Sequence, residues 1–253
     1  MLSGIDCIGV GLAAVAAGMV NALAGGGTLI TFPVLLAVGI PAVAANVTST
    51  VALCPGYLSA TFSQAKDLRG QARRVWLALP AAAIGGLLGG LLLLHTSEKV
   101  FRTAVPFLIL LASGLLALQG PLRNFLLRQT GHTGTGLECW AALPIGMAAV
   151  YGGYFGAGVS VVVLAVLGLM MDDSLTRLNA LKQAIAFSIN IAAACLFVFS
   201  GQVQWWIVLI MTIGSLIGGT LGGRLAGRIK PAILRWIVVT IGLTVGIIYL
   251  VRA

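Results

Sequence analysis

Two glycine clusters interrupt apolar sequence at corresponding places in the two halves of the chain. They read Gly25-Gly26-Gly27-Thr28 and Gly156-Ala157-Gly158-Val159-Ser160. Glycines at this density unwind a helix, because glycine lacks a Cβ and has low helix propensity. The freed backbone N–H groups, with the positive end of a helix that restarts at Thr28 or Val159, would form an anion site. Close helix packing is the alternative, since small residues let backbones approach in a membrane, but both clusters adjoin short segments, which favours a site.

A polar stripe is the second feature that could carry chemistry. Its members are Asn179, Lys182, Gln183 and Asn190, at steps of three, four and seven, so they share one helix face. Asn46 and Ser49 occupy the corresponding place in the first half. A polar stripe in lipid must face the protein interior, and a cation such as Lys182 there marks a functional site unless it snorkels to the surface. Hydroxyls within crossings, such as Thr48 and Ser188, are expected to bond back to their own helix.

The positions of the carboxylates in the sequence argue against a cation substrate. All six fall at termini or in linkers: Asp6, Asp67, Glu98, Glu138, Asp172 and Asp173. Carriers of sodium or protons normally place a carboxylate inside the membrane, so an anion substrate is favoured. The same distribution argues against an intramembrane aspartyl protease, and His95 and His132 offer no metal pair, so we expect no metal and no cofactor. A membrane-embedded enzyme remains the rival class.

These residues must be positioned by membrane helices. Of the 253 residues, 59% are hydrophobic and only 8% charged, with a mean hydropathy of +1.07, which fits no soluble class. Apolar stretches approach the roughly 20 residues of a crossing helix near 5–24, 75–94, 103–119, 178–199, 205–223 and 232–251. Backbone groups in lipid must be satisfied within their own segment, so the fold is predicted to be all-α, with the first stretch retained as a helix.

Other ligands and cross-links are not indicated by the composition. The net charge of +9 comes from short clusters at segment ends, which is a membrane topology signal and not a nucleic-acid-binding stripe. The cysteines are scattered singly, without the spacing of a zinc site or a disulfide framework: Cys7, Cys54, Cys139 and Cys195. The predicted partners are therefore a small anionic substrate and the lipid bilayer, with no nucleic acid. The sequence leaves open whether the chain forms a homo-oligomer.

The two halves are predicted to be duplicates. A shift of 133 residues aligns Ile84-Gly-Gly-Leu-Leu-Gly-Gly90 with Ile217-Gly-Gly-Thr-Leu-Gly-Gly223. The same shift pairs Asn46 with Asn179, Gln71 with Gln204, Arg102 with Arg235 and Val105 with Val238. For Gly85-Gly86 and Gly218-Gly219, which have apolar neighbours, we expect helix packing. The predicted units are a first repeat over 1–119, a central linker over 120–137 and a second repeat over 138–253.

Charge bias predicts how many times the chain crosses. The open question is whether the short segments 28–40 and 159–171 cross or turn back. If both cross, one side collects eleven cations and the other three; if both turn back, the count is seven against seven. The positive-inside rule therefore favours about ten helices, some short or broken, in two inverted five-helix repeats with both termini outside the cytoplasm. Inverted repeats are common in secondary transporters, with the substrate site near the midplane.

These features together resemble the sulfite exporter TauE/SafE family. The resemblance rests on the glycine breaks, Pro33, the Ala45-Asn46-Val-Thr-Ser stretch and Leu178-Asn179-Ala-Leu-Lys182-Gln183, and covers roughly residues 8–120 and 140–251. It implies a transporter of the bacterial inner membrane that moves sulfite or small organosulfonates, usually outward. The second break departs from the family pattern, since it lacks a full glycine triplet and a proline matching Pro33.

We therefore expect alternating access between inverted halves, with one anion held by both breaks and the polar stripe. The expected substrate-binding residues are Gly25, Gly26, Gly27, Thr28, Asn46, Ser49, Gly156, Gly158, Asn179, Lys182, Gln183 and Asn190. The alternative within transport is an anion channel. A channel would show neither saturation nor counterflow.

Overall fold

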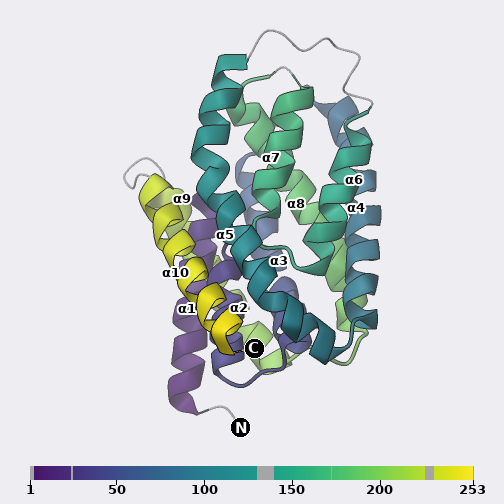
Figure 1. Ribbon diagram of the computed structural model, residues 1–253. Helices are drawn as coiled ribbons and strands as arrows, with labels where there is room; N and C mark the ends of the chain where they lie inside the picture. Colours follow the sequence, from purple (N-terminus) through teal and green to yellow (C-terminus); the bar gives the residue numbers. More distant parts are fainter. Residues whose placement is uncertain (1–2, 24, 130–139, 172, 226–230, 253) are drawn as a thin grey trace.

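The computed structural model describes residues 3–23, 25–129, 140–171, 173–225 and 231–252, and these form ten α-helices (Figure 1). The helices are α1 (Gly4–Leu23), α2 (Thr28–Ala37), α3 (Ala42–Ser63), α4 (Ala72–His95), α5 (Glu98–Gln129), α6 (Ala142–Tyr154), α7 (Val159–Met170), α8 (Leu175–Val198), α9 (Trp205–Leu225) and α10 (Pro231–Arg252). The all-α prediction is confirmed. The predicted linker over 120–137 overlaps α5, and residues 130–137 lie outside the described part of the chain, as do Glu138, Cys139 and Asp172.

Both glycine clusters interrupt helices where the sequence predicts. The chain leaves α1 at Leu23 and resumes at Thr28, and it leaves α6 at Tyr154 and resumes at Val159. Gly25 and Gly26 have φ of 80° and 93°, and Gly156 and Gly158 have φ of 78° and 77°. This left-handed region costs other residues roughly 1–2 kcal/mol, so glycine is required for the turn.

The helices are those of a multi-pass membrane protein. Five of them are long and apolar enough to cross a bilayer: α1, α4, α5, α8 and α10. The helices that follow the breaks are shorter, with 10 residues in α2 and 12 in α7. At 1.5 Å per residue these reach only about 15 and 18 Å, well short of a hydrocarbon core of about 30 Å.

Glycines allow two helix pairs to pack at backbone contact. α1 runs along α9, where a Cβ on Gly218 would collide with the backbone of Val15. α4 runs along α6, where a Cβ on Gly85 would collide with the carbonyl of Gly146. The packing role expected for Gly85, Gly86 and Gly218 is confirmed. The absence of a side chain is not required at Gly219, because a Cβ there would meet nothing within 4 Å, although its backbone N lies close to Gly18 of α1.

We expect Gly218→Ala to destabilise the protein and Gly219→Ala to leave it stable. The first adds a methyl group where α1 and α9 have no space, which costs on the order of 1–3 kcal/mol. The second adds the same methyl in open space and removes a weak helix former, worth about 1 kcal/mol in the other direction. Thermal unfolding of the two purified variants in detergent measures the difference. Equal melting temperatures would contradict the packing role of Gly218.

The packing gathers most of the described cationic side chains at one end of the bundle. The connections that lead into α4 and into α8 join there, through an ion pair between Arg74 and Asp173. Because α10 runs antiparallel to α5, with Arg235 beside Gly120, the start of α10 lies at the same end. We call this the cation-rich end, with Lys66, Arg69, Arg73, Arg74, Arg177 and Arg235 as its members. The start of α1 and the end of α10 lie at the other end, as do Lys99 and Arg102 at the start of α5 (Figure 1).

Candidate functional site

The two breaks meet each other in the folded chain. A Cβ placed on Gly25 would lie 3.1 Å from the Cβ of Ser160. Both breaks also rest on the same helix, since Gly26 faces Leu116 and Gly158 faces Ala112, one turn apart on α5. Segments more than a hundred residues apart thus form one structure. We call residues 25–28 together with residues 155–160 the break junction.

Side chains from α1 and α6 fix each break in place. The Gly27 N–H donates to Asn21 Oδ1 at 2.7 Å, and the Tyr151 hydroxyl donates to the Ala157 carbonyl at 2.6 Å. Four backbone N–H groups of the junction have no hydrogen-bond acceptor among the described residues: those of Gly26, Ala157, Gly158 and Ser160. Buried N–H groups normally find a partner, so these donors are available to an anion.

Helix α3 adds amide and hydroxyl groups to the junction. Asn46 Nδ2 donates to the Tyr154 carbonyl at 2.8 Å, directly before the second break. Ser49, one turn further, shares a 2.8 Å hydrogen bond with Thr31 of α2. Asn46 is only 1% exposed, and its Oδ1 has no hydrogen-bond partner among the described residues. The structure therefore brings Asn46 and Ser49 to the breaks, as the sequence predicts.

Aromatic rings cover the junction on one side. Phe32 of α2 packs edge-on against Phe155 of the second break, with ring centroids 5.3 Å apart. Phe101 of α5 contacts both Phe32 and Tyr154 in the same way. The three phenylalanine rings are buried, so they keep bulk water from the polar groups and strengthen electrostatic interactions at the junction.

Lys182 lies inside the protein and does not snorkel to the surface. It is 5% exposed, and its Nζ donates to Asn179 Oδ1 at 2.7 Å. Asn179 Nδ2 in turn donates to Gln64 Oε1, at the end of α3, at 2.9 Å. Within the described residues no carboxylate pairs with this ammonium. We call Gln64, Asn179 and Lys182 the lysine cluster.

The predicted site residues therefore form two clusters. Asn46 and Gln64 stand near opposite ends of α3, eighteen residues apart, which is about 27 Å along a helix. A single anion cannot touch both in this conformation. Gln183 is buried without a partner among the described residues, while the Nδ2 of Asn190 donates to its own helix at the Ala186 carbonyl.

The hydroxyls of Thr48 and Ser188 do not bond back to their own helices, contrary to the expectation. Thr48 Oγ1 accepts from the Gln204 N–H, and Ser188 donates to the Leu79 carbonyl. The Leu79 carbonyl comes close enough to replace the local acceptor of Ser188, whereas Gln204 supplies Thr48 with a donor from another element. Thr48 thereby links α3 to the segment before α9, and Ser188 links α8 to α4.

Other polar residues near these clusters were not identified from the sequence. Tyr57 hydrogen-bonds to the side chain of Asn21 and shares a buried apolar cluster with Ala186, one turn from Lys182, so it lies between the two polar clusters. Asn21 is the one asparagine of the first apolar stretch, and that isolation could have marked it. Gln64 carries no such signal, because its partner Asn179 comes from the other half of the chain. Tyr151 bonds across the second break to Ala157, six residues ahead, and that contact depends on how the break folds.

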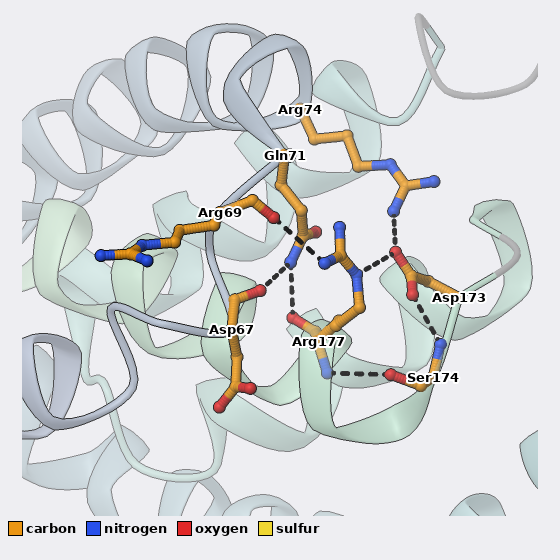
Figure 2. A network of polar contacts seen from close by, with 7 residues as sticks. All are labelled: Asp67, Arg69, Gln71, Arg74, Asp173, Ser174 and Arg177. Carbon is orange, nitrogen blue, oxygen red and sulfur yellow. Dashed lines mark hydrogen bonds and ion pairs between the residues drawn. The ribbon is translucent and has the colours of Figure 1, made fainter.

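A network of ion pairs and hydrogen bonds joins the halves at the cation-rich end (Figure 2). Asp173 Oδ2 accepts from Arg74 Nη1 at 2.5 Å and from Arg177 Nε at 2.9 Å. Arg177 Nη1 also donates to the Arg69 carbonyl, and Gln71 Nε2 donates to the Arg177 carbonyl at 3.2 Å. Figure 2 shows the carboxylate of Asp67 turned away from these contacts. The network ties the α3–α4 connection to the start of α8.

The arginines keep Asp173 ionised. Partial burial by itself would raise the pKa of this carboxyl. Hydrogen bonds from Arg177, the Ser174 N–H and Arg74, with the charge of Arg177, outweigh burial and lower the pKa below its ordinary value. The network therefore contributes stability that is present above the ordinary carboxyl pKa and is lost only as the pH falls through the lowered one.

At the opposite end of the bundle, a carboxylate binds the start of another helix. Glu98, in the first turn of α5, accepts from the N–H groups of Ala42 and Val43 at the start of α3. An acidic group at a helix N-terminus is favourable because it satisfies unpaired donors and complements the helix dipole. This contact lies within the first half, whereas the Asp173 network joins the two halves.

Comparison with known proteins places this arrangement in a family. The family model described as sulfite exporter TauE/SafE matches residues 10–249. A Haemophilus influenzae protein named "Probable membrane transporter protein" is 29% identical over 201 residues, covering 79% of this chain and 77% of its own. The Escherichia coli K12 protein YfcA, with the same description, is 27% identical over 206 residues, covering 81% and 74%. A Sinorhizobium protein, ORF9, is 28% identical over 209 residues, covering 81% and 77%. No solved structure matches the chain.

Proposed function

Since the chain belongs to the sulfite exporter TauE/SafE family, we propose that it is a secondary transporter of a small anion, sulfite or an organosulfonate, moved outward across the bacterial inner membrane. The observation that carries the proposal is Lys182, a buried ammonium in a membrane-crossing helix with no carboxylate partner among the described residues. A buried charge without a counterion is costly. A bound anion would neutralise it.

The two polar clusters are successive anion-binding sites on one transport path along α3 and α8. The lysine cluster lies nearer the cation-rich end and attracts the anion by charge. The break junction offers hydroxyls, and N–H groups that have no acceptor among the described residues, and both fit sulfonate oxygens. Tyr57 and Ala186, packed together between the clusters, support this order.

The packing supports two inverted repeats. Exchanging each helix for the one five places away in the order α1 to α10 converts one set of contacts into another: α1·α9 into α6·α4, α3·α9 into α8·α4, α2·α3 into α7·α8, and α2·α10 into α7·α5. The entry of α4 also bonds to the first turn of α8 through Gln71, as the entry of α9 bonds to α3 through Gln204. We infer that the cation-rich end faces the cytoplasm and both termini face away from it, as the positive-inside rule requires.

Counterflow in proteoliposomes tests the transport proposal. Vesicles loaded with unlabelled sulfite should accumulate labelled sulfite transiently, and uptake should saturate with concentration. Carboxylates of similar size should compete weakly. Flux without saturation and without counterflow would identify an anion channel instead. Absence of any sulfite or sulfonate flux, from protein that remains folded, would remove the proposed substrate class.

The Asp173 network closes the cation-rich end in this conformation, so weakening it should expose the path. We expect Asp173→Asn to speed labelling at Ala186→Cys, a fully buried reporter position, by a membrane-impermeant thiol reagent added at the cation-rich end. The gain should reach up to about fivefold, since a partly exposed ion pair contributes up to about 1 kcal/mol. The background replaces the four native cysteines, Cys7, Cys54, Cys139 and Cys195.

Asp67→Asn is the matched control for this experiment. It removes one carboxylate from the same end, but that carboxylate is turned away from the network (Figure 2). Its labelling rate should equal that of the parent protein. If both variants label equally fast, net charge and not the network controls access to the path.

A further inference from the structure

An unpaired hydrogen-bond acceptor lies beside the break junction. Asn46 Oδ1 is buried and has no partner among the described residues. The amide cannot rotate to relieve it, because its Nδ2 must face the Tyr154 carbonyl, which can only accept. Since both amide atoms share one carbon, Oδ1 lies beside the same carbonyl at the second break. Leaving a buried acceptor unpaired costs about 1–3 kcal/mol.

Other polar groups of the junction supply donors. Four of its backbone N–H groups have no acceptor among the described residues, and these can only donate. The Thr31 and Ser49 hydroxyls share one proton between them, so the second proton of the pair has no acceptor among the described residues. A ligand that satisfies this set must accept several hydrogen bonds and donate at least one.

We propose that the junction selects anions that carry a hydrogen-bond donor of their own, with that donor placed on Asn46 Oδ1. Hydrogen sulfite and sulfonates that bear a hydroxyl or ammonium group belong to this class. An anion without a donor sets a negative oxygen against Oδ1 and leaves it unpaired. This inference rests on the proposed function and names the substrate class of the same site.

Two sulfonates that differ in one hydroxyl group test the inference. The affinities of ethanesulfonate and 2-hydroxyethanesulfonate are measured by the thermal shift of the purified full-length protein. The hydroxylated compound should bind about fivefold or more tightly, since a buried acceptor left unpaired costs at least about 1 kcal/mol. In Asn46→Leu, which removes the acceptor at similar size, the ratio should fall to near one, whatever the change in overall affinity.

Ser188→Ala is the control, because Ser188 is also buried but bonds to α4 away from the junction. It should keep the ratio of the parent protein. Should Asn46→Leu fail to fold, Asn46→Ser replaces it and should reduce the ratio. Equal binding of the two sulfonates by the parent protein overturns the inference and leaves the proposed function standing. No thermal shift with either sulfonate or with sulfite overturns the proposed function itself.

Discussion

We expect Lys182→Met to abolish anion flux in proteoliposomes while leaving the protein folded. The ammonium has no carboxylate partner among the described residues, so its charge remains for the substrate. Losing the partner of a buried charge costs roughly 2–5 kcal/mol, which corresponds to a loss of at least about thirtyfold in flux. Methionine fills nearly the same volume, so no large cavity forms.

The stability of the Lys182→Met variant should move in the opposite direction from its activity. Replacing an unpaired buried charge by an apolar side chain of similar size is neutral or stabilising. The melting temperature without substrate should therefore stay the same or rise, and the shift produced by sulfite should disappear. Lys99→Met, at an exposed position of the opposite end, is the control and should retain flux. Undiminished flux in Lys182→Met would remove Lys182 from the path.

The sequence predicted the elements of this site better than their arrangement. Glycine density placed both helix breaks correctly, because backbone conformation at such clusters depends on local residues alone. Burial of Lys182 also followed from its position in an apolar helix. The separation of Asn46 from the lysine cluster did not follow, because equivalent residues of two repeats need not share one ligand.

Contacts between distant segments explain what the sequence could not supply. Gln64, at the end of α3, accepts a hydrogen bond from Asn179 in the second half of the chain. Gly25 in the first half lies against Ser160 in the second. Neither pair leaves a periodic signal, since each depends on how whole helices cross. Thr48 and Ser188 show the same limit, because their acceptor or donor comes from an element that local propensity does not describe.

The second large effect is expected at the contact between the breaks. Gly25→Ala should reduce flux by more than tenfold, whereas Gly39→Ala should preserve it. Both glycines have left-handed φ, 80° and 85°. Alanine therefore costs roughly 1–2 kcal/mol of backbone strain at either position. Only at Gly25 does the new Cβ meet another side chain, 3.1 Å from the Cβ of Ser160, while Gly39 faces open space.

Comparing the two variants separates strain from position. Equal losses of melting temperature with unequal flux would show that the spacing between the breaks, and not general stability, governs transport. The contact can then be relieved from its other side, because Ser160→Gly removes the Cβ that the alanine meets. We expect the double variant to recover flux relative to Gly25→Ala alone. If Gly39→Ala loses as much flux as Gly25→Ala, the junction has no special place in the path, and the unpaired N–H groups of the two breaks would need another explanation.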